Sequence, residues 1–448
     1  MDASTAIVIP IIVLIFFLII KTPIWIALAL SGTVGLIMVD GLGIATTSLV
    51  QVPLQALGKP TLIIIPLFIL MGMFIKESGL VDRAFSAIQG GRNRLPGGLA
   101  VTTIATSAAF GAVAGTSAAV VGSVGRLSIT EMVKNGYDKS YASGTVAAAG
   151  TLGILIPPSI VLVVYGQITE ESIGALLLAG VIPGLISAAA MMIYASGRAV
   201  IQPSIAGGNQ PAVVYPDASR PSLALRLLNT WGLVWRVLAI FGVVIGGIYS
   251  GVFTPTESAA IAVFVAFAIL VWDRRKDGAS VVRGAVVRSF MEAGVMSGTI
   301  LTLLLGSAIF SVFVVRSGIP RIVTEWMTGL NVPVIVVVIV ILLLMIPLGM
   351  FIDGLSMILI TMPILYPVLD SLGVNGIWFA VLLVKMCELG LITPPVGLNL
   401  FVTARSVQGL SPETVLKGVW PYYIVDLAVV AVLILLPGLV TWLPDVAL

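Results

Sequence analysis

The sequence predicts an all-α polytopic membrane protein built from two inverted repeats, each with a re-entrant hairpin and a broken helix. Three observations support this fold class. Hydrophobic residues make up 59% of the 448 residues and charged residues only 10%, whereas a soluble domain carries about a quarter charged residues. Landmarks recur at a nearly constant interval in the two halves. Two adjacent prolines interrupt one apolar segment in each half.

The repeat is the strongest internal signal. Its three landmark pairs are Gly79 and Gly318, Gly111 and Gly349, and Pro157 and Pro394, separated by 239, 238 and 237 residues. A constant offset between landmarks indicates duplication. We therefore expect each half to contain five crossings and one hairpin, and an odd number of crossings inverts the second half relative to the first.

Residues 1–197 form the predicted first repeat. Its spans lie within about residues 7–75, and its hairpin covers about 97–132. That apolar segment is too long for one crossing and short for two, and Gly115, Thr116 and Ser117 interrupt its centre. The broken helix covers about 141–167, and a further span covers about 173–196.

Thr22 and Pro23 are predicted to open the second helix of this repeat, with threonine as its N-cap and proline in its first turn. The helix is expected to end near Val39. A loop is expected from Asp40 to Pro60, because polar residues interrupt the apolar run there.

Residues 198–230 are the only long polar stretch, rich in glycine and proline, and they predict a cytoplasmic linker. Residues 231–448 form the predicted second repeat. Its hairpin covers about 333–370, with Asp353 and Gly354 near the middle, and its broken helix covers about 377–402.

The basic residues predict the orientation of the chain. With a periplasmic N-terminus, 19 of the 23 lysines and arginines fall on the cytoplasmic side, which the positive-inside rule favours. The exceptions are Lys59, Arg316, Arg321 and Lys385. In this orientation the two hairpins enter from opposite faces, and their tips near Gly115 and Asp353 can meet at mid-membrane.

The two double-proline breaks, Pro157-Pro158 and Pro394-Pro395, are candidate binding sites. Proline lacks an amide hydrogen and obstructs the preceding turn, so each pair frees carbonyl groups. Such a break at membrane depth persists only where it packs in protein or lines a cavity, and paired breaks are typical of secondary transporters. Carbonyls in 150–155 and 388–393 suit a small cation such as sodium, and the helix N-termini after the prolines suit an anion. The nearby hydroxyls are Thr116, Ser117, Thr151, Ser159, Ser356 and Thr393.

Five charged residues in apolar surroundings have competing interpretations. Asp353 is a functional candidate because an intramembrane carboxylate is costly, but it can also cap the helix that follows. Arg316 is commonplace at a helix C-terminus, although it could approach Asp353 or an anionic substrate. Lys385 and Glu388 lie one turn apart and are expected to pair with each other. Glu257 is expected to complete a capping box rather than to act in transport.

The composition also excludes several classes of function. The sequence contains no histidine and only one cysteine, Cys387, so imidazole sites and internal disulfides are excluded. There is no nucleotide-binding loop and no catalytic arrangement of side chains. The basic residues are spread over loops, which argues against nucleic-acid binding.

Several motifs together resemble the large membrane subunit of tripartite ATP-independent periplasmic (TRAP) transporters. They are FGAVAGTSA at 110–118, GILIPPS at 153–159, IPLFIL at 65–70, GIYSGVFTPTE at 247–257 and GLITPPVGLN at 390–399. The resemblance covers nearly the whole chain. Each motif alone is weak, whereas the ordered set is specific.

The resemblance implies a sodium-coupled importer of organic acids in the bacterial inner membrane, working by an elevator mechanism. It implies two partners, a small four-helix membrane subunit and a soluble periplasmic binding protein, and no cofactor other than Na+ as coupling ion. The implied ion-binding candidates are Gly115, Thr116, Ser117, Gly150, Thr151, Gly153, Asp353, Gly354, Ser356, Gly390 and Thr393. The substrate-binding candidates are Ser117, Pro157, Pro158, Ser159, Arg316, Pro394, Pro395 and Asn399.

Two other functions stay open from the sequence. One is a stand-alone carboxylate or anion transporter with the same inverted-repeat plan, which would transport without a periplasmic protein. The other is an intramembrane enzyme or scaffold, against which the missing catalytic groups argue.

Overall fold

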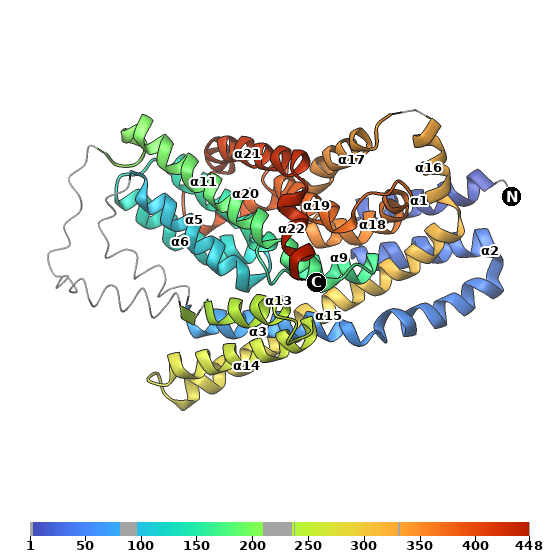
Figure 1. Cartoon of the computed structure of the whole chain (residues 1–448), viewed down its shortest axis with the longest axis horizontal. Coiled ribbons are helices and arrows are strands. Elements are labelled where there is room, and N and C mark those ends of the chain that lie inside the picture. The colour runs from blue at the N-terminus through green and yellow to red at the C-terminus, as the bar shows by residue number, and fades with distance from the viewer. Residues whose placement is uncertain (1–2, 81–95, 209–234, 237, 330–331, 448) are drawn as a thin grey trace.

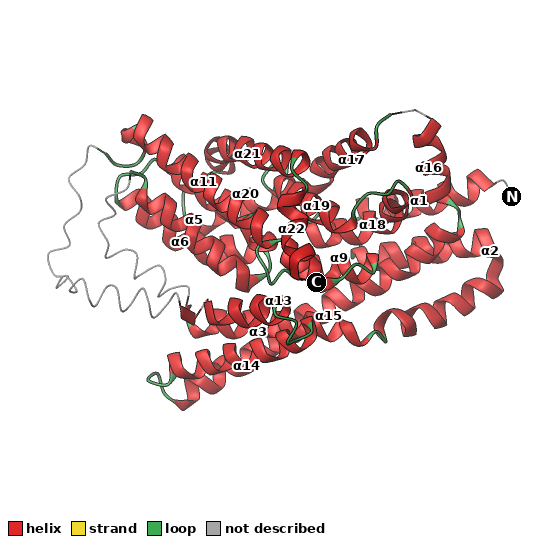
Figure 2. Ribbon diagram, in the orientation of Figure 1, coloured by secondary structure: helices red, strands yellow, loops and turns green. Residues whose placement is uncertain are grey.

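The computed structural model describes residues 3–80, 96–208, 235–236, 238–329 and 332–447. These residues are almost entirely helical, and none of them lies in a β-strand (Figures 1 and 2). Seven of the described helices are long and apolar enough to cross a membrane, and a bent pair makes a possible eighth crossing. The predicted all-α polytopic fold is confirmed.

Four long helices form the lower part of the molecule in Figure 1, and we call them the arm layer. They are α2 (Ile24–Leu57), α3 (Ile64–Ser78), α14 (Pro255–Arg274) and α15 (Ala279–Arg316), with a 3-10 turn, Pro60–Ile63, leading into α3. Helix α1 (Ala3–Ile19) packs against α2. A π-turn (Gly242–Gly246) and α13 (Gly247–Tyr249) precede α14.

The loop predicted between Asp40 and Pro60 is wrong for most of its length. Helix α2 bends at Gly41, whose φ of 81° is outside the helical range, and then continues to Leu57. Glycine adopts this conformation without a steric penalty, so the chain kinks at Gly41 and the helix resumes directly after it. The N-cap is Pro23 rather than Thr22, and no side chain caps this helix.

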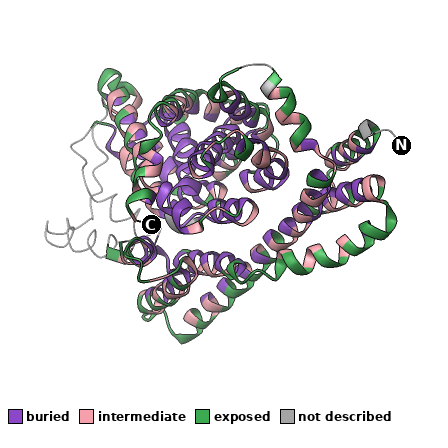
Figure 3. Cartoon of the chain, turned by 45° about the vertical axis from the view of Figure 1, so that its right-hand side comes forward, coloured by how far each residue is buried: buried purple, intermediate pink, exposed green. Residues whose placement is uncertain are grey.

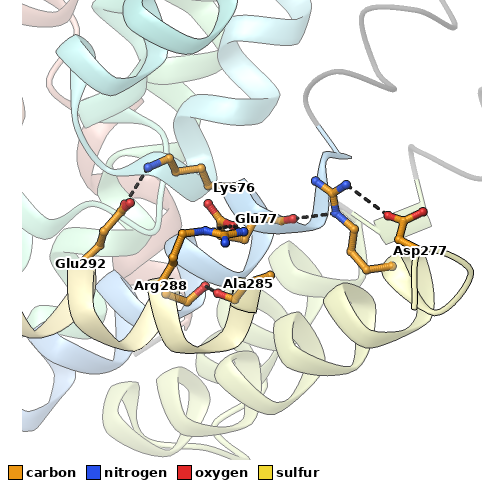
Figure 4. Close-up of polar contacts among 8 residues, drawn as sticks. Lys76, Glu77, Asp277, Ala285, Arg288 and Glu292 are labelled. Carbon is orange, nitrogen blue, oxygen red and sulfur yellow. Dashed lines mark hydrogen bonds and ion pairs between the residues drawn. The ribbon is translucent and has the colours of Figure 1, made fainter. Parts of the chain in front are cut away.

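Ion pairs hold the helices of the arm layer together at one end (Figure 4). The Lys76 ammonium lies 2.6 Å from the Glu292 carboxylate, and Arg288 lies 2.6 Å from that of Glu77. Arg274 donates from Nε to the backbone carbonyl of Glu77 at 3.0 Å. Helices α3, α14 and α15 therefore share one polar cluster around Glu77.

The remaining helices form a more compact body, which we call the core layer (upper part of Figure 1). From the first half of the chain it contains α5 (Gly98–Ala114), α6 (Ser117–Lys134), α7 (Lys139–Gly150), α8 (Leu152–Leu155), α9 (Ile160–Thr169), α10 (Ile173–Ala179) and α11 (Val181–Ile201). The predicted hairpin is the pair α5 and α6, and the predicted broken helix is α7 to α9, bent by 42°. Residues 209–230 of the predicted linker lie outside the described residues.

The second half adds the same kinds of element. These are α16 (Ile319–Gly329), α17 (Val334–Gly349), α18 (Gly354–Ser371), α19 (Gly376–Leu391), α20 (Leu398–Ser406), α21 (Pro412–Leu435) and α22 (Gly438–Ala447). Helices α17 and α18 are the second predicted hairpin, and α19 and α20 are the second broken helix. Helix α16 was not predicted.

The two layers share part of their apolar interior. The largest buried cluster joins both hairpins and both broken helices, and a second cluster joins α3, α14 and α15 to residues of the core layer such as Val163, Leu177 and Leu359. Figure 3 shows the core helices as the most completely buried part of the molecule, whereas the arm exposes long apolar faces. The apolar exposure of the arm suits contact with lipid or with another membrane protein.

A few polar contacts connect the arm layer to the end of α9. Lys59 forms a 3.0 Å ion pair with Glu170, and the Thr61 hydroxyl lies 3.1 Å from the side-chain oxygen of Gln167. Both side chains of the ion pair are exposed, by 44% and 79%. The contact at the end of α9 is therefore polar and hydrated, whereas Ile160, Val163 and Val164 earlier in α9 belong to the same apolar cluster as α3.

Candidate functional site at the hairpin tips and helix breaks

The tip of the first hairpin is seated on the first helix break. A Cβ atom on Gly111 of α5 would lie 2.4 Å from the Cα of Gly153, closer than real atoms approach. A Cβ on Gly150 would lie 3.4 Å from the carbonyl oxygen of Ser117. The chain reverses at Gly115, which has a φ of 66°. Glycine at these positions lets the hairpin backbone touch the backbone of the break.

The second hairpin makes the equivalent contact with the second break. A Cβ on Gly390 would lie 2.6 Å from the Cα of Gly349, and the amide of Gly397 donates to the carbonyl of Met350 at 3.1 Å. Gly349 corresponds to Gly111 and Gly390 to Gly153 in the predicted repeat. The two halves therefore use the same glycine-on-glycine contact between hairpin and break.

The half-helices after the two breaks begin differently. Each break contains a cis peptide bond between its prolines. The Ser159 hydroxyl oxygen accepts a hydrogen bond from the amide of Leu162 at 3.3 Å and so caps α9. No side chain caps α20, which follows Gly397. The uncapped first turn of α20 leaves its amides available to a ligand.

Most of the predicted hydroxyl ligands also have partners within their own helices. Thr151 donates to the carbonyl of Ala148 at 2.7 Å, and Thr393 donates to that of Leu389 at 2.5 Å. A hydroxyl oxygen that donates in this way still has lone pairs for a cation. Thr116 precedes α6 without capping it.

Asp353 caps α18, as one of the two interpretations predicted. One carboxylate oxygen accepts from the backbone amide of Ser356 at 3.1 Å, and the other accepts from its hydroxyl at 2.6 Å. A Cβ on Gly354 would lie 3.4 Å from the side chain of Cys387. The cap therefore holds the second tip against the helix that contains Cys387 and Glu388.

The predicted ion pair between Lys385 and Glu388 is wrong. The Lys385 ammonium instead pairs with Asp426 of α21 at 2.5 Å, and both side chains are fully buried. The prediction considered spacing along one helix only, whereas the partner lies on a neighbouring helix. Asp426 was missed, although it interrupts an apolar run in the same way as Asp353.

Glu388 is consequently a buried carboxylate without a hydrogen-bonding partner. Its residue exposure is 0%, and neither oxygen has a partner among the described residues. The Ser117 hydroxyl lies beside it, and the charges of Lys385, Asp426 and Asp353 lie within electrostatic range. Both hairpin tips and the second break therefore meet around one carboxylate.

Asn399, in the first turn of α20, is the other unpartnered polar side chain next to the second break. It is fully buried, and neither its amide nitrogen nor its amide oxygen has a described partner. A buried amide normally finds partners, so this side chain is available to a ligand. Arg316 lies elsewhere, with its guanidinium 3.8 Å from Asp40 of α2 rather than beside Asp353.

The oxygen groups of this arrangement suit a hard cation better than a transition metal. Among the described residues, no group of three or more histidine, cysteine, aspartate or glutamate side chains could hold a metal ion. The oxygens near the tips come from main-chain carbonyls, hydroxyls and the carboxylates of Glu388 and Asp353. Hard cations prefer such oxygen ligands.

Comparison with known proteins places the chain in a family. Residues 11–439 match the family described as "Tripartite ATP-independent periplasmic transporter, DctM component". The C4-dicarboxylate TRAP transporter large permease protein DctM of Vibrio cholerae is 33% identical, over 97% of this chain and 96% of that protein.

Two further proteins are similar to this chain, one in sequence and one in structure. The isethionate TRAP transporter permease protein DctMQ of Oleidesulfovibrio alaskensis is 31% identical over 94% of this chain and 64% of that protein. The crystal structure of the Alcanivorax borkumensis YdaH transporter has a TM-score of 0.65, at 16% identity and 90% coverage of each chain, and so shares the fold. From the family match and the relatives we conclude that the chain is a multi-pass membrane protein that belongs to the DctM family, the large permease subunits of TRAP transporters.

Proposed function

We propose that this chain is the subunit through which a sodium gradient drives uptake of an organic acid across the bacterial inner membrane. The observation that carries the proposal is the pair of hairpin tips that meet on broken helices around the buried, unpartnered Glu388. A buried carboxylate without a partner is costly in a low-dielectric interior. A bound cation would remove that cost. The opposed carbonyls of the tips would complete its coordination.

The sodium ligands proposed are the tip and break residues, which are Gly115, Thr116, Ser117, Gly150, Thr151, Gly153, Asp353, Gly354, Ser356, Gly390 and Thr393. Glu388 joins them as a source of negative charge. The Ser117 carbonyl next to Gly150 and the carbonyls near Gly390 supply oxygens whose positions are set by backbone contact. A site built from backbone is rigid, which favours one ion size.

The proposed site for the organic acid is formed by the N-termini of α9 and α20. Helix N-termini favour anions because their amides are unsatisfied and the helix dipole is positive there. Asn399 is the side chain best placed to bind a carboxylate, because it is buried and has no described partner. Pro157, Pro158, Pro394 and Pro395 would shape the site, and Ser117 and Ser159 would add hydroxyls. Arg316 is the least supported of the substrate-binding candidates, because it pairs with Asp40.

The proposed cycle moves the core layer against the arm layer as an elevator. Support comes from the division of the molecule into an arm layer and a compact core layer, and from the polar contacts between Lys59, Thr61 and the end of α9. A small four-helix membrane subunit and a periplasmic binding protein would complete the system. The exposed apolar faces of the arm offer the area that a membrane partner needs.

Reconstitution tests this proposal directly. Proteoliposomes with the chain, the small subunit and the binding protein should accumulate solute under an inward sodium gradient without ATP. Replacing sodium with potassium should abolish accumulation. Undiminished uptake in potassium would contradict sodium coupling, and uptake without the binding protein and the small subunit would favour the stand-alone carrier. A panel with a dicarboxylate, a sulfonate and an uncharged sugar tests the substrate class.

A further inference from the structure

Two arginines outside the hairpin tips line one cavity between α6 and α20. The cavity has a volume of about 440 Å³, and its lining residues are Arg126, Thr130, Arg405, Ser406, Val407 and Gln408. Helices α6 and α20 pack directly at this level, since a Cβ on Gly125 would lie 3.3 Å from the hydroxyl of Ser406. Five of the six lining side chains can donate hydrogen bonds.

Neither arginine is neutralised within the part of the chain that the structure describes. Arg126 and Arg405 are exposed, and no described carboxylate pairs with either of them. The end of a helix accounts for a basic residue such as Arg405, which compensates the helix dipole. It does not account for Arg126, which lies in the middle of α6. Two guanidinium groups without a described carboxylate partner therefore line one cavity, which favours an anion there.

The cavity is connected to the candidate transport site by the same two helices. Helix α6 begins at Ser117 and α20 begins beside Asn399, both at the site. At a rise of 1.5 Å per residue, Arg126 lies roughly 14 Å along α6 from Ser117, and Arg405 lies roughly 9 Å along α20 from Asn399. The cavity therefore lies within about two to three helical turns of the candidate transport site. It lies toward the expected cytoplasmic side, where the basic residues concentrate.

We propose that Arg126 and Arg405 form a second, weak anion site that receives a carboxylate solute as it leaves the core for the cytoplasm. Guanidinium groups bind carboxylates through paired hydrogen bonds, and the cavity volume falls in the range of small-molecule sites. Exposure to water keeps the affinity low, as release requires. The inference rests on the proposed import of organic acids for its biological meaning, but its binding test does not require transport.

Protection of the arginines from chemical modification tests the site. The whole chain, in nanodiscs of neutral phosphatidylcholine, is treated with phenylglyoxal, and modification of each arginine is followed by peptide mass spectrometry. Succinate is the probe, against chloride at equal ionic strength. With a Kd of about 5 mM, ~20 mM succinate should slow modification of Arg126 and Arg405 about fivefold. Arg283, an exposed arginine on α15 with no described carboxylate partner, should be unaffected.

A variant of one arginine tests whether Arg126 and Arg405 share one ligand. In Arg126→Gln, succinate should no longer protect Arg405, whereas in Arg283→Gln the protection should persist. Independent protection of Arg405 in Arg126→Gln would overturn the shared site.

Three results with the unaltered chain would overturn the proposal. These are equal slowing by chloride, equal slowing at Arg283, and slowing only when phosphatidylglycerol is added, which would assign the cavity to a lipid phosphate. Sodium-driven uptake without protection would overturn this site alone. Protection without uptake would support the site and contradict the proposed function.

Discussion

Lys385→Met tests the energetic role of the buried ion pair between α19 and α21. The Lys385 ammonium and the Asp426 carboxylate are 2.5 Å apart and exposed by 1% and 0%. Removing one partner of such a pair leaves the other charge uncompensated and costs about 3–5 kcal/mol. Here the loss leaves two buried carboxylates, Asp426 and Glu388, without a nearby cation, so the upper end of that range is expected.

The double variant Lys385→Met/Asp426→Leu separates the pair from its surroundings. Replacing both charges with apolar side chains of similar size is often neutral or stabilising, so the double variant should recover most of the loss. Arg321→Met is the matched control, because Arg321 and Glu325 form a 3.6 Å pair that is exposed by 81% and 69%. An exposed pair contributes about 0–1 kcal/mol.

The only cysteine of the chain provides the assay. Cys387 is buried, so a thiol-reactive fluorophore reports unfolding in detergent, and tryptophan fluorescence gives an independent transition. At about 1 °C per kcal/mol for a chain of 448 residues, Lys385→Met should lower the apparent melting temperature by about 3–5 °C. Equal losses in the single and double variants would refute the reasoning, because the cost would then come from side-chain shape and not from an unpaired charge.

Three further predictions follow from the tips, the breaks and the charge distribution. Asp353→Asn keeps the cap of α18 but removes the charge, so we expect normal insertion with most sodium-driven uptake lost; wild-type rates across a range of sodium concentrations would reduce Asp353 to a cap. Gly111→Ala places a methyl group against the backbone of the first break and should cost about 1–3 kcal/mol in a melting experiment. Gly122→Ala, with nothing within 4 Å, should be neutral or stabilising by about 0.5–1 kcal/mol, and similar losses in both would contradict the close contact. A cysteine in place of Ala206 should resist an impermeant thiol reagent in intact cells, whereas one in place of Lys59 should react; the reverse pattern would reject the topology and the inverted repeat.

The helix breaks and hairpins could be predicted from the sequence because their cause is local. Two adjacent prolines remove two amide hydrogens and obstruct two successive turns, so Pro157-Pro158 and Pro394-Pro395 interrupt helices, whereas single prolines such as Pro363 remain inside a helix. The capping box at Thr254 and Glu257 is confirmed for the same reason, since both of its hydrogen bonds lie within four consecutive residues.

The errors arose where a distant element decides the outcome. Lys385 has an acidic neighbour one turn away on its own helix, yet it pairs with Asp426, 41 residues further along the chain. The polar residues after Asp40 predicted a loop, but one glycine turns the chain and the helix resumes. The glycine-on-glycine contacts could not be predicted, because sequence spacing does not show which backbones meet.

The ion pair between Lys59 and Glu170 has a consequence for the relative populations of any two arrangements of the layers. A pair exposed to this degree contributes about 1 kcal/mol at most, which changes the ratio of two conformations by roughly fivefold. Water and dissolved ions compete for both charges, so an exposed pair of this kind weakens as the salt concentration rises. The ion pair therefore favours one arrangement of the two layers only weakly. Added salt would weaken this preference further without any change in the protein.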